Sequence, residues 1–223
     1  YCCNAPRRTF GATLVADEVD GIFHLTQTRD VMLENLLLVG PGKSVTGSTA
    51  IHLDNANSRW TIRNVQIANF ETGILVGNGN QHANDDLGVH QHVRFVHVKH
   101  GAKLVNTNSF NLRFDSCRWG PNVDIGIYSP FIAAKGATAH DVIVEGGAVV
   151  GVNDTFIKFG AGMNGLCRVR ALHFEPLSTQ NAKLVETHGA AARVHISESV
   201  IRGNGAAPIV DIRGGHVLTF EKN

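Results

Sequence analysis

The chain has little charge, few cysteines and no long hydrophobic run, and each shortage excludes a class of protein. Charged residues make up 17% of its 223 residues, and 20 basic side chains balance 19 acidic ones, so the basic excess of a nucleic-acid-binding protein is missing. No apolar run approaches the roughly 20 residues that a membrane span requires. Nucleic acid is therefore not predicted as a partner, and neither is a membrane-spanning segment.

The four cysteines do not form a disulfide scaffold in a chain of this size. They include no CxxC pair and no Cys/His spacing that is typical of a metal site. Cys2 and Cys3 are adjacent near the start of the chain, whereas Cys117 and Cys167 stand at positions that we expect to face a core. We interpret Cys117 and Cys167 as buried free thiols.

Glycine, by contrast, is abundant, with 24 residues, and it punctuates a cycle that residues 50–76 show most clearly. Alternating segments at 50–53 and 60–67 are separated by the polar turn 54–59, and a second polar bend leads to 73–76, where the pattern starts again. Two short alternating strands followed by such a restart are typical of one coil of a solenoid.

The cycle recurs along the chain without the 3.6-residue spacing of helices. Its alternation breaks at the fourth and fifth residues of the second strand, often at Asn, as in Asn35 and Asn64. We expect the chain to turn a corner between sheets there. The third cycle fits worst, because Gly88 and His90 occupy positions that are apolar elsewhere. The second strand begins near Val31, Trp60, Gly88, Leu112, Val142, Cys167, Val194 and Val217, at intervals of 29, 28, 24, 30, 25, 27 and 23 residues.

Alternating strands also suit a β-sandwich or an antiparallel barrel. Those folds give no reason for the same residue class at the same offset in every cycle, whereas stacked parallel coils bring equivalent side chains to about 4.8 Å from one another. The offsets place Trp60, Trp119 and, in the last cycle, Thr219 in inward columns. We therefore favour a parallel β-helix.

Residues 50–55 (AIHLDN) or 73–76 (GILV), leading to the pattern of 60–67 (WTIRNVQI), resemble the right-handed parallel β-helices of the pectate-lyase-like superfamily. That superfamily includes polysaccharide lyases, galacturonases and phage tailspikes. The resemblance implies an all-β fold over residues 10–223, a single-stranded right-handed parallel β-helix (solenoid) of about eight coils of 23–30 residues each, after an irregular segment at 1–9. It is specific for the fold alone, because the coil recurs and not a catalytic motif.

Stacking converts the outward positions of the second strand into columns, and one column places Asp115 and Glu145 one coil apart. We predict these carboxylates as catalytic. A pair about 5 Å apart suits a retaining glycosidase and a wider pair an inverting one, and close like charges should raise one pKa. With arginines beside them they could instead deprotonate an acidic sugar, as a lyase requires. No cofactor is predicted, apart from Ca²⁺ for a lyase. The predicted substrate-binding residues of this face are Arg113, Arg168, Arg170 and His195.

The alternative for the same column is a solvated charge ladder, in which Arg170 pairs with Glu145 and Arg113 with Asp115. Surface ion pairs of that kind are common and contribute little to stability.

The long polar turn 77–92 supplies a second set of candidates, since loops on a rigid scaffold often bind ligands. Asp85 and Asp86 are predicted to bind substrate; they resemble the Asp pair of galacturonases, although the accompanying motifs of that family are not found in order. His90 and His92 form an HxH pair without a third ligand at a suitable spacing, so no metal site is predicted. Tyr128 is predicted as an exposed aromatic contact.

A long ridged face suits a chain-like ligand, so we expect an extracellular polysaccharide-binding and polysaccharide-degrading protein, a hydrolase or lyase acting on an acidic glycan. A phage tailspike-type receptor-binding depolymerase on the virion surface is one form of this hypothesis. The alternative is a non-catalytic structural or adhesive solenoid, such as a tail-fibre or surface-attachment segment. Because an uncapped β-helix exposes sheet edges, we also expect a fragment of a longer chain or an oligomer, such as a homotrimer.

Overall fold

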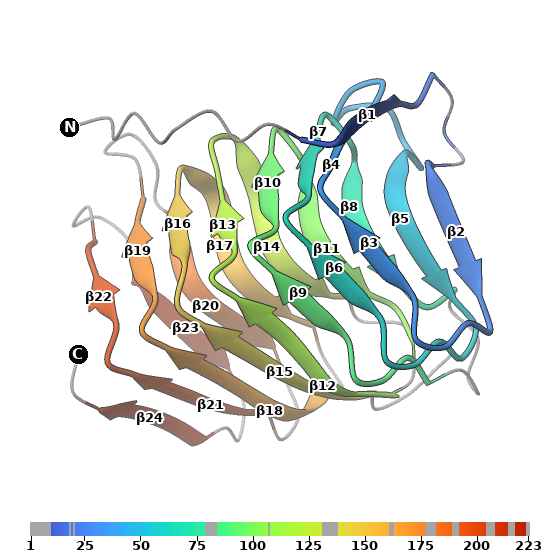
Figure 1. The fold of residues 1–223 in the computed structure, drawn as a ribbon. Helices are drawn as coiled ribbons and strands as arrows, with labels where there is room; N and C mark the ends of the chain where they lie inside the picture. Colours follow the sequence, from blue (N-terminus) through green and yellow to red (C-terminus); the bar gives the residue numbers. More distant parts are fainter. Residues whose placement is uncertain are drawn as a thin grey trace.

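The computed structural model shows a right-handed parallel β-helix whose described regular elements are all strands (Figure 1). The fold class predicted from the sequence is therefore confirmed. In Figure 1 the coils run from β2 and β3, in blue, to β22 and β24, in red. The structure describes residues 10–17, 19, 21–78, 84–106, 108–130, 138–160, 163–176, 182–188, 192–203, 208–213 and 217–221.

Each coil contributes one strand to each of three eight-stranded parallel sheets, which we call sheets 1, 2 and 3. Sheet 1 contains β1 (Ala12–Val15), β4 (Leu36–Val39), β7 (Gln66–Ala68), β10 (Arg94–Val96), β13 (Arg118–Trp119), β16 (Ala148–Val150), β19 (His173–Glu175) and β22 (Val200–Ile201). Sheet 2 contains β2 (Phe23–Thr26), β5 (Thr49–Asp54), β8 (Thr72–Val76), β11 (His100–Leu104), β14 (Val123–Ser129), β17 (Val152–Phe159), β20 (Lys183–His188) and β23 (Val210–Arg213). Sheet 3 contains β3 (Met32–Glu34), β6 (Thr61–Arg63), β9 (Val89–Gln91), β12 (Asn108–Asp115), β15 (Thr138–Glu145), β18 (Met163–Arg170), β21 (Ala192–Ser197) and β24 (Val217–Glu221).

The number of coils differs slightly from the prediction. Six strands of each sheet have a paired neighbour on both sides, and the outermost two are edges. The stack thus holds about six coils covered on both sides, and the predicted number of about eight includes the two end layers.

The core lies between the three sheets and consists of the columns that alternation predicted to face inward. Along sheet 3, Ile62, Phe114, Val144, Val169 and Ile196 are at most 1% exposed. Period-2 alternation sends these side chains to the same face, and strand stacking brings them into contact with their equivalents. Trp60, Trp119, Cys117 and Cys167 are all buried, and burial raises the pKa of both thiols to about 12.

The last coil corrects the predicted register by one residue. His195 pairs with Thr219 and Ile196 with Phe220, so Thr219 lies in an outward column and not in the inward column that its offset predicted. A one-residue shift moves a side chain to the opposite face of a strand. The last second strand therefore aligns one residue later than the offset predicted, with Leu218 as the register partner of Val194.

The irregular third coil has a packing explanation. His90 is fully buried and stacks on Phe114, with ring centroids 4.3 Å apart. Its Nδ1 lies 3.0 Å from the Arg113 carbonyl oxygen, and its Nε2 accepts a hydrogen bond from Trp60 Nε1 at 3.4 Å. A Cβ at Gly88 would clash with the Trp60 indole, so the glycine makes room for the tryptophan. Burial lowers the pKa of His90 to about 4, which keeps the ring neutral.

The predicted corners between sheet 3 and sheet 1 are confirmed, because the residue that follows the last outward position of the sheet 3 strand adopts a positive φ. Asn35 has φ 58° and Asn64 has φ 54°. Asparagine tolerates this left-handed conformation better than most residues, because its side chain can hydrogen-bond locally. Later coils place His92, Ser116, Gly146, Ala171 and Glu198 in the same conformation.

The corner at Asn64 gives a direct test of this register. Asn64→Val should lower the free energy of unfolding by about 1–2 kcal/mol, because a β-branched residue is strained at positive φ, whereas Asn64→Gly should change it little. Denaturant unfolding followed by circular dichroism measures both. Thr61→Val, on the preceding strand of the same coil, is the matched control. Equal effects of valine at both positions would contradict the corner assignment.

Candidate functional site

Sheet 3 brings most of the predicted site residues together on its outer face. Asp115 pairs in register with Glu145, and Glu145 with Arg170. The neighbouring outward column pairs Arg113 with Ile143, then Ile143 with Arg168, and Arg168 with His195. Both columns are those that the sequence predicted, so parallel stacking has converted positions far apart in the chain into neighbours.

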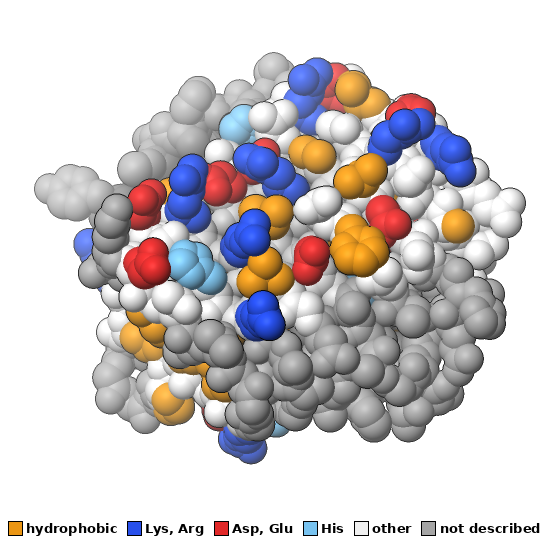
Figure 2. All heavy atoms as spheres, turned by 90° about the horizontal axis from the view of Figure 1, so that it is seen from below, with side chains coloured by type: hydrophobic (Ala, Val, Ile, Leu, Met, Phe, Trp, Pro, Cys, Tyr) orange, Lys and Arg blue, Asp and Glu red, His pale blue; other side chains and the backbone are white. Residues whose placement is uncertain are grey.

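A shallow hollow of about 650 Å³ lies over β15, β18 and β21 on this face, and we call it the sheet 3 hollow. Figure 2 shows the face from below, with cationic, anionic and hydrophobic side chains intermixed. Ile143 and Leu166 supply apolar lining, and Asp115 borders the hollow through its contact with Arg113. Its charged and titratable lining residues are Arg113, Glu145, Arg168, Arg170, Arg193 and His195.

Both predicted catalytic carboxylates are held by arginines. Arg113 Nε donates to Asp115 Oδ1 at 2.7 Å, and Arg170 NH2 lies 2.6 Å from Glu145 Oε1. The hydrogen bond from Arg170 to Glu145 raises the pKa of Arg170. These are the two pairings of the charge-ladder hypothesis, and each of them occupies one oxygen of the carboxylate.

Two other arginines of the hollow are differently placed. Arg168 and Arg193 are exposed, and neither forms an ion pair with any residue in the described part of the chain. His195 Nε2 lies 4.0 Å from Glu221 Oε2, at the far limit of an ion pair. The hollow therefore presents guanidinium groups that are available to an anion.

Asp85 does not face solvent, which corrects its predicted role in substrate binding. Its side chain is fully buried, and Oδ1 accepts hydrogen bonds from the Asn57 backbone at 2.9 Å and from Asn57 Nδ2 at 3.0 Å. Burial raises the pKa of Asp85. Asp86 Oδ1 accepts a hydrogen bond from the Phe110 backbone at 2.8 Å. Both residues hold the turns between coils together, and residues 79–83 of this turn lie outside the described part.

Tyr128 lies on β14 of sheet 2 and therefore not on the face of the hollow. It is half-buried and stacks on His100, with ring centroids 5.0 Å apart. Its predicted role as an exposed contact to the same ligand as Asp115 and Glu145 is not supported by this position.

Sheet 2 carries an ion-pair network that the sequence interpretation missed. Glu186 is 6% exposed and lies 2.6 Å from Lys183 Nζ, 2.6 Å from His188 Nε2 and 3.3 Å from Lys158 Nζ. Lys183 also reaches Asp211 at 2.8 Å. The signal was present in the outward column of the first strand of each cycle, where Lys158, Glu186 and Asp211 are register partners. A second missed group on this sheet, His24, His52 and Asp54, is the one cluster found among the described residues that could hold a metal ion.

None of the comparisons with protein-family models, curated proteins and solved structures gives a significant match. The structure by itself shows the parallel β-helix. Because no comparison matches, membership of the pectate-lyase-like superfamily stays a hypothesis. A search of the described residues also found no helix with the length and hydrophobicity needed to cross a membrane.

The Glu186 network predicts a specific pH dependence of stability. Burial disfavours the charge on Glu186, yet hydrogen bonds from Lys183 and His188 lower its pKa from 4.5 to about 2. A carboxyl group with a lowered pKa stabilises the fold above pH 4.5, and this contribution is lost as the pH falls towards 2. A shift of this size corresponds to roughly 3–4 kcal/mol as an upper limit.

Glu186→Gln should therefore be less stable than the wild type at pH 7, and the gap should close between pH 4.5 and 2. Urea unfolding across this pH range measures the gap. Glu198→Gln, at an exposed corner, is the control for the loss of one surface carboxylate. A gap for Glu186→Gln that is independent of pH would contradict the role of its charge.

Proposed function

We propose that the protein binds an extended acidic polysaccharide across the outer face of sheet 3. The observation that carries this proposal is the pair of exposed arginines in the sheet 3 hollow, Arg168 and Arg193, which have no carboxylate partner among the described residues. Guanidinium groups recognise carboxylate and sulfate oxygens through paired hydrogen bonds. An acidic sugar supplies such groups at regular intervals.

The architecture supports a chain-like ligand over a compact one. Outward side chains repeat at about 4.8 Å along the stack of strands, so binding groups form a ladder along the helix axis. Ile143 lies in register between Arg113 and Arg168, and Leu166 is the register partner of Arg193. Both line the hollow and offer apolar contacts to the faces of sugar rings. Binding sites commonly combine such apolar contacts with a few charged groups that fix the orientation of the ligand.

Polysaccharide degradation is the further part of this proposal, and the in-register pair of Asp115 and Glu145 favours it. An acidic group of the ligand would compete for Arg113 and Arg170, and this would release both carboxylates for acid–base or nucleophilic work. An extracellular or virion-surface setting, a tailspike-type depolymerase and a homotrimer belong to this proposal. Ca²⁺ enters it only for a lyase.

A non-catalytic adhesive solenoid is the second candidate function. The ion pairs that hold Asp115 and Glu145 favour it, because they give both carboxylates a structural role on the surface. It shares the binding face of the first candidate and lacks only the chemical step.

If the glycan binds in the sheet 3 hollow, removing arginines from the hollow should weaken binding, and removing arginines from another sheet should not. The double variant Arg168→Ala with Arg193→Ala should weaken binding of dextran sulfate or polygalacturonate at least about tenfold, since a hydrogen bond to a charged group is worth roughly 1.5–3 kcal/mol. Isothermal titration calorimetry measures the affinity, and neutral dextran is the ligand control.

The matched protein control is Arg94→Ala with Arg118→Ala, which removes the same charge from the outer face of sheet 1. This control should retain the wild-type affinity within about threefold, a difference below 1 kcal/mol. An equal loss in both double variants would show a general charge effect and contradict a site on sheet 3.

If the protein cleaves the glycan, substitutions of the two carboxylates should reduce cleavage without reducing binding. Asp115→Asn and Glu145→Gln should each lower depolymerising activity on an acidic glycan at least about 100-fold, as loss of an acid–base group does, while Arg168 and Arg193 keep the glycan bound. Release of reducing ends reports a hydrolase, and Ca²⁺-dependent absorbance of an unsaturated sugar reports a lyase. Activity that survives both substitutions would rule out the pair, and binding without any cleavage by the wild type would favour the adhesive function.

A further inference from the structure

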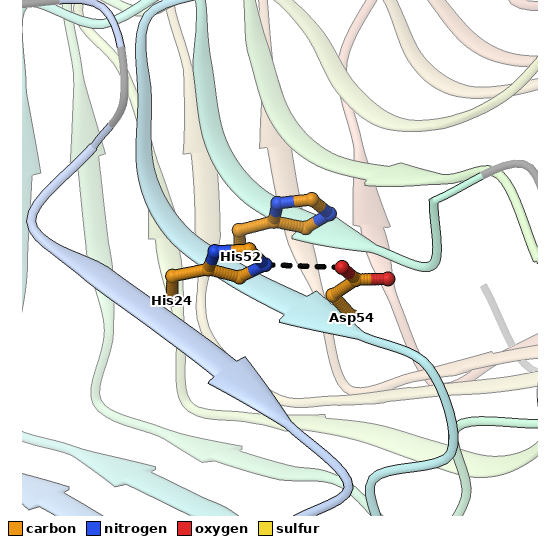
Figure 3. A group of neighbouring side chains, drawn as sticks. All are labelled: His24, His52 and Asp54. Carbon is orange, nitrogen blue, oxygen red and sulfur yellow. Dashed lines mark hydrogen bonds and ion pairs between the residues drawn. The ribbon is translucent and has the colours of Figure 1, made fainter.

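Two histidines and an aspartate lie together on the outer face of sheet 2, on β2 and β5. The sheet 3 hollow lies on a different sheet and on later coils. His24 on β2 is the register partner of His52 on β5, and Asp54 follows two residues later on the same face of β5. The imidazole rings are parallel within 2°, with centroids 4.7 Å apart, and the Asp54 carboxylate lies beside them (Figure 3). One ligand atom from each residue lies within 4.8 Å of the other two.

The contacts of this cluster leave donor atoms for a ligand. His24 Nε2 lies 3.1 Å from Asp54 Oδ2, and His52 Nε2 lies 3.1 Å from the carbonyl oxygen of Gly77. Asp54 Oδ1 is buried and has no hydrogen-bond partner among the described residues. A buried oxygen without a partner is costly, and the cost is larger for a charged group.

The surroundings add negative charge. Burial first, and then the nearby charges of Asp86 and Asp54, raise the pKa of Asp85. Asn57 Nδ2 donates both to the Asp54 carbonyl oxygen at 3.1 Å and to Asp85 Oδ1 at 3.0 Å, so the two aspartates are neighbours. A cation beside Asp54 would offset their negative charge.

We propose that His24, His52 and Asp54 form a binding site for a divalent transition-metal ion of the Zn²⁺ type. Two imidazoles and one carboxylate are a donor set that Zn²⁺ accepts, with water at the remaining position, whereas Ca²⁺ and Mg²⁺ prefer oxygen ligands alone. Backbone carbonyls next to ligating histidines commonly orient the ring, as the Gly77 oxygen does for His52.

The site requires only a small adjustment. Donors bound to Zn²⁺ at about 2.0–2.2 Å lie roughly 3.3–3.6 Å from one another in a tetrahedron, and the present separations extend to at most 4.8 Å. The His24 side chain is 54% exposed, so its ring is free to rotate towards the ion. The partly exposed position also gives the ion an entry path.

An ion held there would fasten the first strand of sheet 2. β2 is an edge strand and has β5 as its one partner in that sheet, and edge strands open more readily than central ones. Ligands from both strands would be joined through the metal, which stabilises the bound state by mass action. The inferred role is thus structural and independent of glycan binding.

Titration of the untagged full chain with Zn²⁺, followed by isothermal calorimetry, tests the site. The wild type should bind one ion, and His24→Ala, His52→Ala and Asp54→Asn should each weaken binding at least about tenfold, the loss typical of disturbed metal sites. His173→Ala is the matched control, because His173 also contacts a carboxylate, Glu175 at 2.9 Å, on sheet 1. Cys2→Ser with Cys3→Ser tests for thiolate ligands.

Hydrogen exchange gives an independent measurement on the same samples. Zn²⁺ should slow amide exchange in β2 in the wild type and not in His52→Ala, with β20 as an unaffected internal reference. Absence of binding at millimolar Zn²⁺, wild-type affinity in all three ligand variants, or an equal loss in His173→Ala or in the cysteine variant would each overturn the proposal.

Discussion

Parallel, in-register stacking of short strands is the constraint on which the rest of this structure depends. Each side chain has its equivalents about 4.8 Å above and below it. The size and polarity of a residue must therefore fit those of its neighbours in the same column. The third coil shows how strict this is. His90 replaces an apolar residue only because the Trp60 Nε1 and the Arg113 carbonyl satisfy its ring nitrogens, and Gly88 is small because Trp60 occupies the space beside it.

The same stacking organises charge on the outside, where it gives two different results. On sheet 3, Glu145 and Arg170 neutralise one another while Arg168 and Arg193 stay without a described anionic partner. On sheet 2, Lys183 lies between Glu186 and Asp211, and the three charges form one network. Charges that pair with one another contribute to stability, whereas charges without a partner are available to a ligand. Sheet 3 is therefore a better candidate than sheet 2 for a ligand-binding face, because it carries Arg168 and Arg193.

The sequence predicted what depends on repetition and missed what lies in or beside the turns. The alternation, the corners at Asn35 and Asn64 and the buried Cys117 and Cys167 all recur at fixed offsets, and all are confirmed. The slip at Thr219 and the burial of Asp85 arise in or beside turns, where no periodicity applies. The metal candidate escaped notice because His24 and His52 lie in the first strand of each cycle. Outward columns were predicted for the second strands only, and the register of β2 with β5 is what places these two histidines side by side.

Edge strands show a further regularity of the outer columns. An edge strand has one neighbour instead of two, so directional contacts to that neighbour matter more there than in the middle of a sheet. Arg63 on β6 holds Glu34 on the edge strand β3 at 2.7 Å, and Lys183 on β20 holds Asp211 on the edge strand β23 at 2.8 Å. His24 and Asp54 join β2 to β5 in the same manner. An isolated surface pair contributes little. A network contributes more than an isolated pair, so at the end of sheet 2 near β23 the Glu186 network adds polar contacts to a fold that its apolar core otherwise stabilises.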